Sequence, residues 1–258
     1  IIIDSLSPKR LVLNTPTYDV YAQRALAHDI PIIKLPLSSD GQPDVLKLLA
    51  CDEGDLVVMI NPNNPTGHLL KPDAIKEFIG RFKGMLIIDE AYVEYAGLHH
   101  SLQHIALEHK NVIILRTFSK AWGLAGVRLG YALASPKLVK QFELHQNPYS
   151  VNTIAMHCGI NALHQVDKLE SQVQKVKANK KVLIDKLRLQ SIKVSDTEAN
   201  FILVELPDIE EGHRILRFKV KPVRRRPLLG GESDCLRVTV GSQTDTEIFS
   251  RAISELVL

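Results

Sequence analysis

The sequence contains little of several features that define specialised protein classes. Its 258 residues include only three cysteines, Cys51, Cys158 and Cys235, and no two of them form a Cys-x-x-Cys pair. Sparse and distant cysteines exclude a disulfide-stapled miniprotein and favour reduced thiols. No apolar run approaches the roughly 20 residues that a membrane helix needs. We therefore expect a cytoplasmic protein that does not span a membrane.

An excess of charge of either sign is also missing. Lysine and arginine number 32 against 29 aspartate and glutamate residues, which leaves a net charge of only +3. This balance neither requires nor excludes nucleic acid, and we expect neither nucleic acid nor a membrane surface as a partner. The ten histidines contain no His-Glu-x-x-His pattern, so we expect no metal site. With 14 glycines and 13 prolines, the composition also excludes collagen and low-complexity disorder.

The first half of the sequence alternates short apolar runs with helical stretches. Runs rich in valine, isoleucine and leucine predict strands that are buried on both faces, at 11–13, 56–60, 85–88, 112–115 and 131–134. Helical candidates lie between several of them, such as residues 72–82, which begin with proline. This alternation predicts an α/β fold with a mostly parallel sheet.

The pattern changes in the second half. Residues 152–190 are helix formers and predict a long helix with a break near Gln165. Strands are expected at 200–205 and 235–240, and a closing helix at 244–258. We therefore expect a large domain over residues 1–164 and a smaller α+β domain over residues 165–258. A basic stretch over 216–227 is typical of a solvated loop, and an anion site is the alternative.

Four polar segments in the first half each follow the end of a predicted strand. They begin at Thr15, Asn61, Asp89 and Thr117. The carboxyl ends of parallel strands meet at one edge of a sheet, where α/β proteins bind ligands. Each segment alone is typical of an ordinary turn, but together they bring a lysine, an aspartate, a tyrosine and an asparagine to one place.

These residue types suit a cofactor that carries an aldehyde on a pyridine ring. The amine of Lys120 can condense with an aldehyde, and Asp89 can keep a ring nitrogen protonated. Arg128 follows Lys120 by eight residues and can bind a phosphate beside Ser119. Tyr18 can stack on the ring face.

At these motifs the sequence resembles the fold-type-I pyridoxal-phosphate aminotransferases, and within them the histidinol-phosphate aminotransferase family. The matching segments are collinear over nearly the whole chain. They are PTY at 16–18, NPNNPTG at 61–67, DEAYVEY at 89–95, RTFSKAWGLAGVRLGYALA at 116–134, NPYSVNTIA at 147–155, ANFIL at 199–203 and CLRVTVG at 235–241.

The resemblance implies a role for each matching residue. Lys120 forms the Schiff base with the cofactor and moves the substrate proton, Asp89 pairs with the pyridinium, and Tyr92 hydrogen-bonds the 3-oxygen. The other cofactor-binding residues that it implies are Asn64 at the 3-oxygen, Thr117, Ser119 and Arg128 at the phosphate, and Tyr18 over the ring. Arg237 binds the anionic group of the substrate. Arg224 is similar to the second substrate arginine of the family, and Arg225 and Arg226 are equally placed for that role.

The activity implied is transfer of an amino group from histidinol phosphate to 2-oxoglutarate, by a homodimer that shares its active sites between subunits. Threonine-phosphate decarboxylase and aromatic aminotransferase activities would use the same core. A non-catalytic aminotransferase-like domain of a transcription regulator is an alternative of another class. The resemblance also implies that the N-terminal part of the family fold, with a phosphate-binding turn, is absent from this chain.

Overall fold

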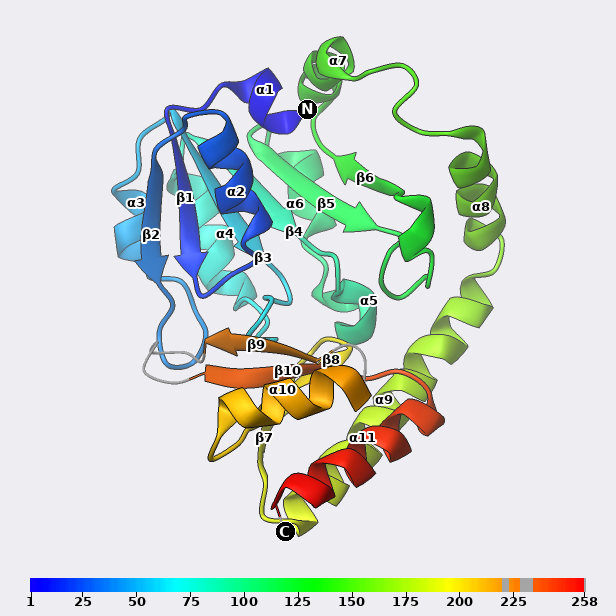
Figure 1. Cartoon of the computed structure of the whole chain (residues 1–258). Coiled ribbons are helices and arrows are strands. Elements are labelled where there is room, and N and C mark those ends of the chain that lie inside the picture. Colours follow the sequence, from blue (N-terminus) through cyan, green and yellow to red (C-terminus); the bar gives the residue numbers. More distant parts are fainter. Residues whose placement is uncertain (220–222, 228–233, 258) are drawn as a thin grey trace.

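The computed structural model describes residues 1–219, 223–227 and 234–257, which form two sheets with flanking helices (Figure 1). The larger sheet has the strand order β2-β1-β3-β4-β5-β6, in which β6 alone is antiparallel to its neighbour. The expected mostly parallel α/β sheet is confirmed. Its strands are Arg10–Thr15 (β1), Ile32–Pro36 (β2), Asp55–Ile60 (β3), Met85–Asp89 (β4), Val112–Thr117 (β5) and Gly130–Leu133 (β6).

The smaller sheet is antiparallel and has the order β7-β8-β10-β9. It faces the carboxyl edge of the larger sheet (Figure 1). Its strands are Lys193–Ser195 (β7), Phe201–Glu205 (β8), Val223–Pro227 (β9) and Asp234–Thr239 (β10). A division between the domains at residues 164 and 165 stays a prediction.

Helices cover both sheets. Those associated with the larger sheet are Ile2–Leu6 (α1), Val20–Ala27 (α2), Val45–Leu49 (α3), Pro72–Arg81 (α4), Val93–Ala96 (α5), Gln103–Glu108 (α6) and Pro136–His145 (α7), with 3₁₀ turns at Leu98–His100 (η1) and Ala125–Val127 (η2). The others are Thr153–Leu163 (α8), Val166–Leu189 (α9), Ile209–Lys219 (α10) and Gln243–Val257 (α11). The expected long helix is therefore two helices, with the break at Gln165 where the sequence predicts it.

Successive residues of the central strands belong to different cores. Val57 and Met59 of β3 pack in the cluster that includes Phe78 of α4. Leu56 and Val58 pack in the cluster on the other face, which includes Phe142 of α7. Because side chains alternate across a strand, a strand covered by helices on both sides must be apolar at every position. That explains the unbroken apolar runs in the sequence.

A third core fills the smaller sheet and reaches the larger one. It joins Leu183 of α9, Phe201 of β8, Leu236 of β10 and Phe249 of α11. Tyr92, in the segment after β4, belongs to the same cluster, and its ring meets that of Phe201 edge to face at 5.4 Å. The core of the smaller sheet therefore packs directly against a predicted site residue.

The expectation of a solvated loop over 216–227 is wrong. The stretch contains the last residues of α10 and the whole of β9, which pairs with β10 and places Arg224 opposite Arg237 in the register. β9 ends the strand order of its sheet. Edge strands carry charged residues because charge discourages pairing with another chain, so their composition resembles that of a loop. The side chains of Arg224, Arg225 and Arg226 lie outside the described residues.

No helix in residues 1–219, 223–227 and 234–257 is long and apolar enough to cross a membrane. Over the same ranges, no three side chains among histidine, cysteine, aspartate and glutamate come together in a way that would hold a metal ion.

Gly67 joins the turn after β3 to the smaller sheet domain. Its backbone has φ +73°, and its carbonyl accepts a hydrogen bond from the Glu198 N–H at 2.9 Å. A Cβ atom added at Gly67 would lie 2.1 Å from the Cβ of Thr197. Thr197 cannot easily move, because its hydroxyl donates to the Phe201 carbonyl and accepts from the Ala199 N–H. Glycine is therefore required by conformation and by space.

We expect Gly67→Ala to lower the free energy of unfolding by about 2–4 kcal/mol, from the left-handed backbone and the overpacking together. Urea denaturation measures the loss. Gly80→Ala is the matched control, because Gly80 lies in α4 with nothing within 4 Å of an added Cβ. That change should be neutral or stabilise by up to about 1 kcal/mol. Equal effects of the two variants would contradict this account of Gly67.

Candidate active site

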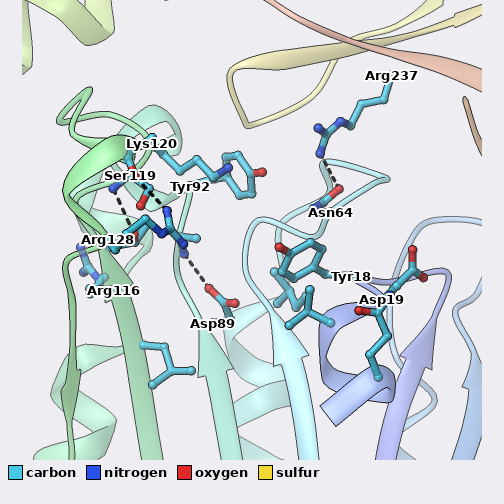
Figure 2. A pocket seen from close by; sticks show the side chains of 17 residues that line it. Tyr18, Asp19, Asn64, Asp89, Tyr92, Arg116, Ser119, Lys120, Arg128 and Arg237 are labelled. Carbon is cyan, nitrogen blue, oxygen red and sulfur yellow. Dashed lines mark hydrogen bonds between the residues drawn. The ribbon is translucent and has the colours of Figure 1, made fainter. Parts of the chain in front are cut away.

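A cavity of about 570 Å³ lies between the carboxyl edge of the larger sheet and β10 of the smaller one (Figure 2). Small-molecule sites commonly measure roughly 300–1,000 Å³. The cavity is lined by nine predicted site residues: Tyr18, Asn64, Asp89, Tyr92, Thr117, Ser119, Lys120, Arg128 and Arg237. The predicted convergence of strand ends at one edge therefore brings these side chains to one place.

Asp89 is the last residue of β4, and hydrogen bonds from two directions hold its carboxylate. Oδ1 accepts from the Ala91 N–H at 2.9 Å, and Oδ2 accepts from the hydroxyl of Tyr21 at 2.6 Å. Burial raises the pKa of Asp89, whereas the two hydrogen bonds and the charge of Lys120 lower it. The carboxylate is thus fixed in direction at the base of the cavity.

Lys120 lies in the turn that follows β5, and its side chain extends across Tyr92 (Figure 2). Its Nζ is 5.3 Å from the centre of the Tyr92 ring. Backbone hydrogen bonds hold the turn, from Gly123 N–H to Lys120 O at 3.0 Å and from Phe118 N–H to Leu129 O at 3.0 Å. The amine therefore projects from a braced turn, over an aromatic ring that is itself buried.

Hydroxyl groups and a guanidinium gather beside this turn. The Thr117 hydroxyl accepts from the Ser119 N–H at 3.0 Å. Arg128 has φ +57°, and its Nη1 donates to the Ala125 carbonyl at 2.8 Å. A left-handed conformation at a residue other than glycine costs of order 1–3 kcal/mol and is concentrated at functional sites. Together the three side chains offer the donors that bind a phosphate.

Arg237 approaches the cavity from the smaller sheet. Its guanidinium lies over the ring of Phe201, with Cζ 5.0 Å from the ring centre, and its Nη1 donates to Asn64 Oδ1 at 2.8 Å. With the amide oxygen of Asn64 engaged in this way, the amide nitrogen is the group that can donate into the cavity. The two predicted residues are 173 positions apart in the sequence and are brought together only by the fold.

Tyr18 lies at the mouth of the cavity and is 41% exposed. Its ring meets that of Tyr21 edge to face at 6.4 Å. A tyrosine that is half exposed at the mouth of a cavity can cover one face of a flat ligand.

Sequence reasoning missed a buried ion pair at the wall of the cavity, between Glu90 and the lining residue Arg116. Arg116 Nε donates to Glu90 Oε2 at 2.8 Å, and Arg116 Nη2 donates to the Ser101 hydroxyl at 2.9 Å. Glu94 Oε1 is 3.5 Å from the same guanidinium, and burial raises the pKa of Glu94. A signal was present in the sequence, because Glu90 and Arg116 are charged residues directly beside predicted strand ends.

Sequence reasoning also missed Tyr21. Its hydroxyl reaches Asp89 from α2, across 68 positions of sequence. The only signal was its place three residues after Tyr18 in the sequence. Nothing in the sequence indicates that the ring meets a carboxylate.

The donor set fits pyridoxal phosphate in each of its parts. An amine, a fixed carboxylate, an amide with a phenol, and a guanidinium with two hydroxyls correspond to the aldehyde, the ring nitrogen, the 3-oxygen and the phosphate. A parallel sheet that presents this set at its carboxyl edge defines the fold-type-I class of pyridoxal-phosphate enzymes.

Comparison with known proteins agrees with this class. The model of the family "Aminotransferase class I and II" matches residues 4–256, and the chain therefore belongs to that family. The expected fold and cofactor, and its identity as an aminotransferase, are confirmed.

Individual relatives extend the comparison. A histidinol-phosphate aminotransferase of Thermoanaerobacter sp. strain X514 is 33% identical over 245 residues, which are 93% of this chain and 68% of that protein. The crystal structure of the histidinol-phosphate aminotransferase from Clostridium acetobutylicum superimposes with a TM-score of 0.90 at 24% identity, over 99% of this chain and 80% of that one. The enzyme of that name from Sinorhizobium meliloti, in complex with pyridoxal-5'-phosphate, gives a TM-score of 0.86 at 23% identity, over 97% and 71%.

Proposed function

We propose that the protein transfers an amino group from histidinol phosphate to 2-oxoglutarate, which yields imidazole-acetol phosphate and glutamate. The observation that carries the proposal is a pair of guanidinium groups in the cavity that holds Lys120, those of Arg128 and Arg237, beside a third arginine, Arg116, that is paired with Glu90. One can serve the cofactor phosphate, and the other can serve the anionic group of each substrate in turn. The relatives named histidinol-phosphate aminotransferase support this choice of substrate.

When bound, pyridoxal phosphate supplies an aldehyde that condenses with amines and a ring that accepts the electron pair left when a proton leaves the substrate. The chain supplies the binding groups. We assign the pyridine nitrogen to Asp89, the 3-oxygen to Asn64 and Tyr92, and the ring face to Tyr18. The phosphate is assigned to Thr117, Ser119 and Arg128.

Lys120 has two duties in this proposal. Its amine would hold the aldehyde of the cofactor, and the same amine would accept and return the proton that leaves the substrate Cα. The position of Nζ above the Tyr92 ring supports this assignment, because it keeps the amine beside the cavity that Lys120 lines.

Reduction with borohydride after incubation with pyridoxal phosphate should fix the cofactor covalently on Lys120. Peptide mass mapping locates the label. Lys120→Ala should lose both the label and at least about a hundredfold in turnover, because the amine attaches the cofactor and transfers the proton. Lys137→Ala, at the start of α7 and outside the cavity lining, should retain both. A label on Lys137 or Lys140 would contradict the assignment.

Recognition of two different anions by one site calls for a planar guanidinium. Histidinol phosphate carries a phosphate and glutamate carries carboxylates, and arginine can form paired hydrogen bonds with either group. Arg237 is held on a strand, in contact with Phe201 and Asn64, so that its guanidinium keeps a fixed direction. Arg224, opposite Arg237 in the register, remains our proposal for the second arginine, with Arg225 and Arg226 as alternatives.

Arg237→Lys should lower kcat/KM both for histidinol phosphate and for glutamate, while cofactor binding is retained. In each case the loss of transition-state stabilisation should be about 2–3 kcal/mol, the contribution of hydrogen bonds to charged groups. Arg251→Lys, on the exposed side of α11, is the control and should change neither. The assay includes two further substrates, phenylalanine and threonine phosphate, as tests of the alternatives. Rapid turnover of phenylalanine without phosphate-ester activity, or release of CO₂ from threonine phosphate, would replace the proposed substrate.

We further propose that the enzyme is a homodimer. Support comes from apolar side chains exposed on α8, such as Ile154 at 73% and Ile160 at 54%, since clustered exposed apolar residues mark association surfaces. Light scattering should give the mass of two chains. Ile160→Glu should lower that mass, whereas Leu189→Glu, exposed at the end of α9, should not.

The small number of cysteines favours the cytoplasm as the compartment.

A further inference from the structure

The contact between Tyr21 and Asp89 joins two parts of the larger sheet domain at the base of the cavity. Tyr21 is the second residue of α2, and its hydroxyl donates to Asp89 Oδ2 at 2.6 Å. Hydrogen bonds from a hydroxyl to a carboxylate are short and roughly twice as strong as neutral ones. Tyr21 itself is not among the residues that line the cavity, so it acts from behind Asp89.

The two donors to Asp89 leave a defined part of the carboxylate for a ligand. An ionised carboxylate offers about four acceptor positions on its two oxygens. Ala91 N–H occupies one position on Oδ1 and the Tyr21 hydroxyl occupies one on Oδ2. Because each oxygen has its own donor, from a different element of the fold, rotation of the carboxylate would break at least one hydrogen bond.

The phenol remains a donor over the working pH range. Burial, followed by the charge of Asp89, raises the pKa of Tyr21 well above its ordinary value. The titratable groups that face Asp89 are Tyr21 from α2 and Lys120 from the turn after β5, and Tyr18 faces Tyr21. The hydrogen bond from Tyr21 lowers the pKa of Asp89, whereas burial raises it. Removal of the Tyr21 hydroxyl would therefore raise the pKa of Asp89 further.

We propose that Tyr21 is a positioning residue whose hydroxyl aims Asp89 at the pyridine nitrogen of the cofactor and keeps that carboxylate ionised. The inference rests on the proposed function, since it takes Asp89 to be the partner of that nitrogen. It also gives α2 a role in the site. Tyr18, in the segment just before α2, lies at the mouth of the cavity, and its ring contacts that of Tyr21 on the first turn of α2, so the two are placed together.

The test is the affinity of the complete protein for pyridoxal phosphate in Tyr21→Phe, measured by titration between pH 8 and pH 6. We expect the dissociation constant to rise about tenfold, and more at pH 6 than at pH 8, because the fraction of ionised Asp89 falls as the pH approaches its raised pKa. With ¹⁵N-labelled cofactor, the ring-nitrogen resonance should move toward its deprotonated position. The shape of the Phe side chain preserves packing, and a melting curve checks it.

Tyr95→Phe is the matched control. Tyr95 is a buried phenol outside the cavity lining, so the variant loses a comparable hydroxyl without touching Asp89. Its cofactor affinity and ring-nitrogen resonance should not change. Equal effects of Tyr21→Phe and Tyr95→Phe, or a loss in Tyr21→Phe that does not depend on pH, would overturn the inference, because either result indicates a purely structural role.

Asp89→Asn separates this inference from the proposed function. If Asp89→Asn weakens cofactor binding and Tyr21→Phe adds nothing in that background, the two residues act as a unit and the inference is supported. If Asp89→Asn weakens binding while Tyr21→Phe alone does not, the inference fails and the proposed site stands. If Asp89→Asn leaves binding and the ring-nitrogen resonance unchanged, the proposed site itself is wrong.

Discussion

Parallel pairing of β3, β4 and β5 is the constraint on which the site depends. Ile60 pairs with Asp89 and Asp89 with Leu115 in the register. The hydrogen bonds continue past the strand ends, from Asn61 N–H to the Asp89 carbonyl at 2.8 Å and from Glu90 N–H to the Leu115 carbonyl at 2.9 Å. The backbone of Asp89 is thus held on both sides. A carboxylate at the end of a central strand is therefore placed by the sheet itself, and the loops that carry Asn64 and Lys120 begin within a few residues of the same edge.

The buried pair of Glu90 and Arg116 acts on these same two strands. Each member is adjacent in sequence to a predicted site residue, Asp89 in one case and Thr117 in the other, and both side chains are at most 4% exposed. Breaking such a pair leaves an uncompensated buried charge, at a cost of about 3–5 kcal/mol. The Ser101 hydroxyl and the Leu102 N–H also donate to Glu90. The ends of β4 and β5 are therefore coupled by charge as well as by the sheet, which limits independent movement of Asp89 and Lys120.

Much of this arrangement was predictable from local pattern, and the exceptions have physical causes. The central strands are apolar at every position because both faces are covered, and their polar ends then indicate the site. The apolar pattern does not predict β2, because β2 is an edge strand with a half-exposed face. The pattern does not predict β9 either, because β9 forms a strand by pairing with β10 rather than through an apolar pattern of its own. The Tyr21–Asp89 contact is set by the direction in which α2 crosses the sheet, which no short-range pattern encodes.

Two sheets meet at the cavity, and a hydrogen bond between them joins two of the proposed site residues. Arg237 on the smaller sheet donates to Asn64 on the larger one, so the residue proposed for the substrate anion fixes the amide proposed for the 3-oxygen of the cofactor. A guanidinium has five N–H donors, and it can keep this hydrogen bond while a fork of two others meets a carboxylate or a phosphate. Lysine lacks that planar geometry. The need to satisfy Asn64 and two kinds of anion at once is therefore a physical reason for arginine at position 237.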